Sequence, residues 1–259
     1  MINQHIKTFW NRRFLLIELV KKGIKLKYRR SYLGILWSLL EPILTTVVLT
    51  IVFGTLFGNH DKEFPLYILC GRLLYSFFSL GTKVASKSIR ANSSMIKKVY
   101  VPKYLYPLSS VLYNYILFLI SLIVIFPLKI YCHASLNIRI IDFFISLIFL
   151  LILTLGVGLI LSTINVFFRD MEYLWEVLLM LIMYTSAIFY YPDKLMKSGF
   201  SWILKCNPLY WIITFFRNAI LGIKTEFQTI VFAGMFSVIV LLIGIYVFYK
   251  KQDKFILHI

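Results

Sequence analysis

Hydrophobic positions along the chain gather in long runs, which short polar and basic segments separate. Six of these runs are long enough to cross a bilayer as helices, at residues 34–57, 65–82, 104–128, 140–167, 173–190 and 229–249. A helical span needs about 20 apolar residues. The runs are continuous, whereas the strands of a membrane barrel alternate apolar with polar residues. The pattern therefore predicts an all-α integral membrane protein with six transmembrane helices.

The first 33 residues differ from the rest of the chain because they are strongly basic. Leu16, Val20 and Ile24 recur at helical spacing among the charges, which is typical of an amphipathic helix lying along the inner membrane surface. A basic arm that only enforces orientation is the alternative, and both interpretations can hold. We therefore divide the chain into a cytoplasmic interface segment, 1–33, and a transmembrane domain, 34–259.

A second basic segment, residues 83–103, lies between the second and third runs. It holds six Lys and Arg residues and no Asp or Glu. Cationic segments beside membrane spans stay on the cytoplasmic side. With both termini inside, 19 of the 28 Lys and Arg residues fall in inner segments and 8 in outer ones, and Arg72 lies within a span. We therefore expect an N-in, C-in topology.

Residues 191–228 contain apolar stretches that are too short to cross a bilayer, and Pro192 and Pro208 interrupt them. Proline breaks the helical hydrogen-bond ladder, and the Trp and Tyr residues of this region suit the headgroup layer. We expect short re-entrant or gate helices here, between the fifth and sixth spans.

The composition agrees with a membrane protein and narrows its chemistry. Hydrophobic residues make up 60% of the 259 residues and charged residues 15%, and the mean hydropathy is +0.82. The topology accounts for the net charge of +17, so no nucleic-acid partner is expected. The sequence has no GxxxxGK[ST], HExxH or GxSxG motif, and its three Cys and four His lack metal-ligand spacing. We expect no catalytic residue and no metal site.

Charged residues inside predicted spans carry a functional hypothesis by default. Glu41, in the inner half of the first span, could line a polar passage or pair with a nearby basic residue. For Arg72, in the outer half of the second span, we favour a structural role in which it extends outward or meets Asp61 or Glu63. Glu176 lies about one turn inside the fifth span and is expected to pair locally.

Four motifs, in order along the chain, carry a resemblance to a known family. They are Lys27-Tyr-Arg-Arg-Ser-Tyr-Leu-Gly-Ile-Leu-Trp-Ser-Leu-Leu-Glu-Pro42, Ile89-Arg-Ala-Asn92 with Ile96-Lys-Lys-Val-Tyr-Val-Pro-Lys103, Asn165-Val-Phe-Phe-Arg-Asp170, and Asn207-Pro-Leu-Tyr with Arg217. Together they resemble the membrane subunits of ABC-2 type transporters, in the branch that exports O-antigen, capsule or teichoic-acid polymers. The sequence departs from that pattern at Gly71-Arg-Leu-Leu-Tyr75, where members often have a Pro-Trp-type pair, and at Ser186-Ala187, where they often have Ser-Pro.

The resemblance implies a permease that exports a lipid-linked, O-antigen-like polysaccharide across the cytoplasmic (inner) membrane of a bacterium. It also implies a homodimer of six-span subunits, bound on the cytoplasmic face to two copies of a separate ATPase subunit. ATP and Mg²⁺ would bind to that partner and no cofactor to this chain, which agrees with the missing phosphate loop.

The resemblance further implies roles for individual residues. An ATPase-coupling helix would comprise Arg90, Asn92, Met95, Ile96, Lys97, Lys98, Val99 and Pro102, in which Met95, Ile96 and Val99 offer apolar side chains ringed by charge. The inner gate would comprise Lys27, Tyr28, Arg29, Arg30, Trp37 and Glu41, the turn between spans four and five Asn165, Arg169 and Asp170, and the outer gate Asn207, Pro208 and Arg217. Phe53, Phe57, Tyr184, Phe189 and Tyr190 are candidates to line the channel and stack on sugar rings, although most aromatic residues should face lipid or pack between helices.

Several alternatives stay open at the level of sequence. Teichoic-acid or capsule export is nearest, followed by ABC-2 drug efflux. An ion-coupled secondary transporter would work without an ATPase and usually has inverted repeats, which we do not detect. A membrane-embedded glycosyl or acyl transferase should show a cluster of His or acidic residues at one face, and none is evident.

Overall fold

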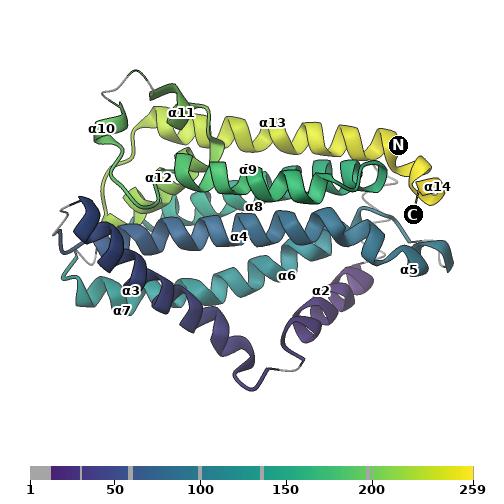
Figure 1. Ribbon diagram of the computed structural model, residues 1–259, viewed down its shortest axis with the longest axis horizontal. Helices are drawn as coiled ribbons and strands as arrows, with labels where there is room; N and C mark the ends of the chain where they lie inside the picture. Colours follow the sequence, from purple (N-terminus) through teal and green to yellow (C-terminus); the bar gives the residue numbers. More distant parts are fainter. Residues whose placement is uncertain are drawn as a thin grey trace.

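The computed structural model describes residues 13–29, 31–57, 61–98, 101–134, 137–196, 199 and 201–258. These residues form a bundle of helices (Figure 1). The longer helices are α2 (Arg13–Tyr28), α3 (Trp37–Phe57), α4 (Phe64–Ala91), α6 (Leu105–Ser121), α8 (Ile140–Phe167), α9 (Met171–Thr185), α12 (Pro208–Leu221) and α13 (Phe227–Lys251). The shorter ones are α5 (Ser93–Lys98), α7 (Ile125–Tyr131), α10 (Asp193–Met196), α11 (Ser201–Lys205) and α14 (Phe255–His258). The all-α fold predicted from the sequence is confirmed for the described residues.

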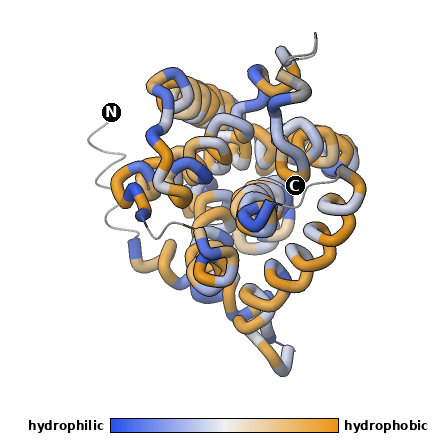
Figure 2. Tube along the Cα trace, turned by 90° about the vertical axis from the view of Figure 1, so that its left-hand side faces the viewer, coloured by the Kyte–Doolittle hydropathy of each residue, from blue (hydrophilic) through white to orange (hydrophobic). Residues whose placement is uncertain are grey.

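Five helical segments are long and apolar enough to cross a membrane: Gly34–Leu56, Phe64–Ala91, Leu105–Tyr131, Ile140–Phe167 and Phe227–His258. They coincide with five of the six predicted spans. Many of their large apolar side chains are exposed, and the end-on view in Figure 2 shows that hydrophobic residues make up much of the bundle's trace. An apolar outer surface of this extent is typical of a protein that lies in lipid.

The predicted fifth span, residues 173–190, differs from the structure. Its helix, α9, has 15 residues and ends at Thr185, so it is roughly 22 Å long, shorter than the hydrocarbon core of about 30 Å. The chain then leaves the helix at Ala187, whose φ of 49° is incompatible with a right-handed helix. The fifth of the six predicted spans therefore stays a prediction.

The basic segment 83–103 is only partly a loop. Helix α4 continues to Ala91, beyond the predicted end of the second span, so Lys83, Lys87 and Arg90 lie on a helix. The reason is local: residues 83–91 include neither Pro nor Gly, and α4 ends where the Asn92 N–H binds the carbonyl of Ile89 at 3.3 Å. The charges of the segment thus belong partly to the helical bundle.

The centre of the bundle is formed by α8, which packs against both α4 and α13. At the crossing of α8 with α13, a Cβ placed on Gly244 would lie 2.5 Å from the carbonyl oxygen of Gly156. Only glycine allows the two backbones to approach this closely. The crossing brings the C-terminal half of the chain onto the same core as α4.

Helices α2 and α3 lie on one side of this core. Helix α2 confirms the predicted helix in the N-terminal segment, and it packs along α6, where Gly23 lies against the ring of Tyr113. Helix α3 crosses α4 obliquely (Figure 1) and leaves most of its apolar side chains exposed. These two helices therefore cover α4 and α6 from one side without joining the central core.

Candidate functional site

The predicted site residues collect at two ends of the bundle and in a cavity between them. Helices α5 and α14 lie at one end, which we name the α5 end, and α10 and α11 lie at the opposite end, the α10 end (Figure 1). Each end has its own polar cluster, and each cluster joins elements that are far apart in the sequence.

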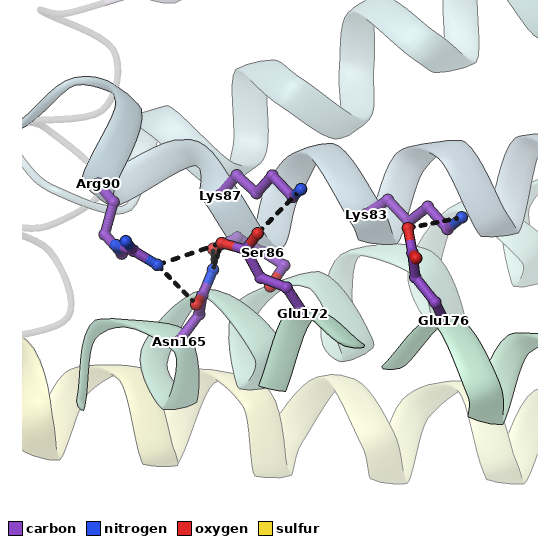
Figure 3. A network of polar contacts seen from close by, with 7 residues as sticks. All are labelled: Lys83, Ser86, Lys87, Arg90, Asn165, Glu172 and Glu176. Carbon is purple, nitrogen blue, oxygen red and sulfur yellow. Dashed lines mark hydrogen bonds and ion pairs between the residues drawn. The ribbon is translucent and has the colours of Figure 1, made fainter. Parts of the chain in front are cut away.

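At the α5 end, ion pairs connect α4 to α9 (Figure 3). The Lys83 ammonium lies 3.2 Å from the carboxylate of Glu176, and the Lys87 ammonium lies 2.9 Å from that of Glu172. Arg90 Nη1 donates to Glu172 Oε1 at 3.2 Å. The prediction that Glu176 pairs locally is confirmed. Isolated surface pairs contribute little, but here two cations share one carboxylate.

Asn165 of α8 is the buried centre of this network. Its Nδ2 donates to the Ser86 carbonyl oxygen at 2.9 Å and to Glu172 Oε1 at 3.0 Å, and its Oδ1 accepts from Arg90 Nη1 at 3.3 Å. The Asn165 side chain is fully buried, so its bond to the Ser86 carbonyl is made without competition from water. Arg90 and Asn165, predicted in two separate motifs, therefore belong to one cluster that ties α4, α8 and α9 together.

Glu172 belongs to this cluster although it was not among the residues predicted from the sequence. A signal existed, because Glu172 is an acidic residue in the turn that follows Asn165 and faces a strongly basic segment. Arg169 and Asp170, which were predicted in the same turn, are exposed instead. The carbonyl of Asp170 accepts from the N–H of Tyr173 and Leu174 at 3.1 Å, so this residue begins α9.

The segment predicted to couple to an ATPase contains a short helix, α5, in which Ile96 does not point outward as expected. Asn92 begins the helix by accepting, through its carbonyl, from the N–H groups of Met95 and Ile96 at 3.0 Å. Ile96 is buried within the chain itself and is not an apolar side chain offered to a partner. Lys97 and Lys98 are exposed, and Met95 is half-buried. Val99 lies outside the described residues, and Pro102 precedes α6, where its carbonyl accepts from the N–H of Leu105 at 3.1 Å.

Ile96 packs in a small apolar cluster that includes the C-terminal segment of the chain. Phe255 of α14 is fully buried there, with its ring 5.3 Å from that of Phe248 and 5.9 Å from that of Phe167. Lys103 Nζ donates to the carbonyl of Gln252 at 2.6 Å, and the surrounding protein lowers the pKa of Lys103 while Asp253 opposes that shift. From the sequence, the charges of this C-terminal segment only indicated its side of the membrane. The segment shares one apolar cluster with α5, α4, α6 and α8.

The predicted inner-gate residues line a cavity of about 130 Å³ between α2, α3, α4 and α6. Lys27, Tyr28, Trp37 and Glu41 contribute to its wall, and so does Arg72 from α4. Burial lowers the pKa of Lys27, whereas the charge of Glu41 raises it. The oblique course of α3 thus brings Glu41 and Arg72, the charged residues of the first two predicted spans, to one cavity. Arg29 is exposed.

The remaining member of the predicted inner gate, Arg30, lies outside the described residues, as does the side chain of Phe57 from the predicted channel lining.

At the α10 end, Arg217 of α12 binds the backbone that follows α9. Its Nη1 donates to the Ala187 carbonyl at 3.0 Å and its Nη2 to the Ile188 carbonyl at 3.3 Å, while Nε donates to the Tyr67 carbonyl at 3.1 Å. The guanidinium also lies 3.4 Å from the centre of the Tyr67 ring. Arg217 is 4% exposed, so its donors bind backbone carbonyls in the interior, where an unpaired carbonyl is costly.

Neighbouring side chains complete this cluster, which we name the Arg217 cluster. The Tyr67 hydroxyl donates to the carbonyls of Ala187 and Tyr190 at 2.9 and 3.0 Å. Asn207 begins α12 by accepting from the Leu209 N–H at 3.0 Å, and its Nδ2 donates to the Ser186 hydroxyl at 2.9 Å. Pro208 is the first residue of α12, a position where its missing N–H has no consequence.

Three of the predicted channel-lining aromatic residues lie together beside the Arg217 cluster. The Phe53 ring of α3 stacks on that of Phe189 at 4.8 Å, and the Tyr184 ring meets Phe189 at 6.2 Å. The Tyr190 hydroxyl donates to the carbonyl of Tyr184 at 2.8 Å. The stack joins α3 to the non-helical segment after α9, and its Tyr184 side chain is exposed.

Replacing Arg217 with lysine should destabilise the protein by roughly 3 kcal/mol, because lysine keeps the charge but leaves buried carbonyls unpaired. The measurement is thermal unfolding of the purified protein in detergent. Arg139→Lys is the matched control, since Arg139 is half-exposed and forms an ion pair with Asp142. Equal unfolding temperatures for the two variants would contradict the role of the Arg217 cluster.

Replacing Phe255 with alanine should cost about 3–5 kcal/mol of stability, because it leaves a cavity in the apolar cluster around Ile96. Backbone amides of α5 should also exchange with deuterium faster in this variant. Leu257→Ala is the control, because Leu257 is 81% exposed and should be nearly neutral. Unchanged exchange in α5 would show that the C-terminal segment does not hold that helix.

Comparisons with known proteins show the family of this chain. Residues 15–221 match the model of the family described as ABC-2 type transporter. The chain is 29% identical to an O-antigen export system permease protein, RfbA, of Klebsiella pneumoniae, over 93% of both chains, and 28% identical to an RfbA of Myxococcus xanthus over 82% of both. It is 24% identical to the polysialic acid transport protein KpsM of Escherichia coli, over 90% of this chain and 91% of that protein. The chain therefore belongs to the ABC-2 type transporter family of multi-pass membrane proteins.

Proposed function

We propose that this chain is the permease subunit of an ABC transporter that exports a lipid-linked, O-antigen-like polysaccharide across the cytoplasmic membrane of a bacterium. The observation that carries the proposal is the match to an O-antigen export system permease over 93% of both chains. Energy would come from ATP hydrolysis on a separate ATPase subunit. The sequence has no phosphate loop of its own, which supports this division.

In this proposal the subunit has six spans, with both termini in the cytoplasm. The α5 end would face the cytoplasm, because the basic residues of α4 and α5 and the last residues of α13 are found there. Helix α9 with the segment 186–190 would form the fifth span, closed on the outer side by α10, α11 and α12. A non-helical segment is tolerated in a membrane where protein groups satisfy its backbone, which is the role of the Arg217 cluster.

The ATPase would bind at α5, one copy on each subunit of a homodimer. Lys97 and Lys98 are exposed at its end, and the buried Ile96 connects the helix to the rest of the bundle. Displacement of α5 would move the apolar cluster around Ile96 and, through Arg90 and Asn165, the start of α9. The network of Figure 3 would therefore carry motion from the ATPase to the fifth span.

The passage for the polymer would lie between two copies of α3 and α9. Both helices expose apolar faces in one subunit, including Leu44, Val48, Val177 and Leu181, so a second subunit can cover part of them. The stack of Phe53, Phe189 and Tyr184 would offer aromatic faces to sugar rings at the outer side of this passage.

Capsule export is the second candidate, and the similarity to the polysialic acid transport protein KpsM favours it. The two functions share the same mechanism and differ in the polymer. Teichoic-acid export and drug efflux by an ABC-2 transporter have no comparable support among the relatives described above.

The proposed topology predicts that Cys206 reacts with a membrane-impermeant maleimide added outside intact cells. Cys206 is exposed between α11 and α12, whereas Cys70 and Cys132 are buried and should stay unlabelled. A Lys251→Cys variant with Cys206 replaced by serine is the control, and it should react only after the membrane is permeabilised. Labelling of Cys206 only after permeabilisation would overturn the proposed orientation.

The proposed coupling surface predicts that the double variant Lys97→Glu/Lys98→Glu weakens association with the ATPase subunit by more than about tenfold, since both charges at the contact are reversed. Co-purification of the two subunits and surface display of the polysaccharide measure the effect. Lys250→Glu/Lys251→Glu makes the same charge change at the end of α13 and should leave association intact. Full association in the α5 variant would exclude α5 as the coupling surface.

A further inference from the structure

A second cavity lies beneath α2, next to the one that Glu41 and Arg72 line. It has a volume of about 450 Å³ and is bounded by α2, α4 and α6. The two cavities share Lys27, Leu80 and Asn114 in their walls, so they adjoin each other. The proposed mechanism assigns no role to this second cavity.

One wall of the cavity is a polar stripe on the membrane-spanning helix α6. The stripe consists of Tyr106, Ser109, Ser110, Tyr113 and Asn114, which recur at helical spacing and all line the cavity. Polar residues within a span are unfavourable unless they have a function or a partner. Ser109 and Asn114 donate to carbonyls of their own helix, at 2.9 Å in each case.

Tyr106 is the exception in this stripe. Its side chain is 1% exposed, and among the described residues its hydroxyl has no hydrogen-bond partner. Buried hydroxyls are almost always hydrogen-bonded, so one without a partner points to a bound group that accepts a hydrogen bond from it. The cavity is the space in which such a group would lie.

The opposite wall supplies positive charge and apolar surface. Lys22 and Lys27 of α2 line the cavity, and no Asp or Glu is present among the described residues of its wall. Leu19, Leu26 and Leu80 provide apolar contacts beside them. The site therefore combines two cations, a free hydroxyl donor and an apolar surface, which is the chemistry that recognises the phosphate of a lipid.

We propose that this cavity binds the headgroup of an anionic phospholipid from the inner leaflet. Its phosphate would lie between the ammonium groups of Lys22 and Lys27 and would accept a hydrogen bond from the Tyr106 hydroxyl. The acyl chains would extend along Leu19 and Leu26 into the bilayer. The inner-leaflet location rests on the topology proposed above, whereas the binding chemistry does not.

Such a lipid would hold α2 against the bundle. Helix α2 contacts α6 through Gly23, where a Cβ would lie 2.4 Å from the Tyr113 ring. A phosphate held by α2 and α6 together adds a second connection between the same two helices. The lipid composition of the inner leaflet would then control how readily α2, the predicted inner-gate helix, separates from α6.

Native mass spectrometry of the purified full-length permease tests the proposal. The protein is prepared from cells that make no glycan substrate, and it is then reconstituted with phosphatidylethanolamine and phosphatidylglycerol. We expect one phosphatidylglycerol per subunit to be retained in preference to phosphatidylethanolamine. Lys22→Gln/Lys27→Gln should reduce retention more than about tenfold, and Lys21→Gln/Lys25→Gln, the same charge change at residues outside the cavity wall, should not.

The variant Tyr106→Phe distinguishes an effect on lipid binding from an effect on the stability of the fold. Because the hydroxyl has no partner among the described residues, its removal should leave the unfolding temperature of lipid-free protein unchanged, while phosphatidylglycerol retention falls by about tenfold. Adding inorganic phosphate at millimolar concentration should not displace the lipid, because it lacks the apolar part.

Four results would overturn the proposal. They are equal retention of the two lipids, equal loss in the two lysine double variants, displacement by inorganic phosphate, or retention only when lipid-linked glycan is supplied. All measurements use the permease without its ATPase partner, so failure of lipid binding leaves the proposed transport function intact. Conversely, a permease that retains phosphatidylglycerol but exports no polysaccharide would refute the transport proposal and leave the lipid-binding proposal intact.

Discussion

The structure depends on one constraint, which is that a backbone carbonyl buried in an apolar environment must find a donor. The chain leaves the helical path after Thr185, and the carbonyls of Ala187 and Ile188 then have no partner from a helix ladder. Arg217 supplies two donors to them and a third to Tyr67. Without these bonds the segment after α9 would have to continue as a helix or move to water, and the short helices α10 to α12 could not fold back into the bundle.

The same constraint operates at the other end of α12. The buried Lys129 ammonium donates to the carbonyl of Ile220, in the last turn of that helix, and Gly222 ends it with a φ of 74°. A cation at a helix C-terminus interacts favourably with the free carbonyls and with the helix dipole. Helix α12 is thus capped at both ends by side chains, Asn207 at the start and Lys129 at the end. This explains how a helix of 14 residues can be buried between longer ones.

At the α5 end, both ion pairs and apolar contacts connect the helices. Asn165, Arg90 and Glu172 join α4, α8 and α9, while the cluster around Ile96 joins α5 to the C-terminal segment. A helix with one buried side chain and two exposed lysines has little stability of its own, since six residues do not form a stable helix alone. Its position is therefore set by the neighbours that bury Ile96, and a force applied to it reaches those neighbours directly.

The sequence by itself determined the helical class, five of the long apolar helices, the amphipathic helix in the N-terminal segment and the family. These features depend on run length, helical periodicity and local motifs. All three are properties of residues that are close together in the sequence. Only the tertiary structure decided that α9 ends at Thr185, that Ile96 points inward, that Glu172 joins Arg90 and Asn165, and that Glu41 and Arg72 line one cavity. Arg217 and Tyr67 are 150 residues apart, and a contact over that distance is fixed by how helices pack, which no local pattern encodes.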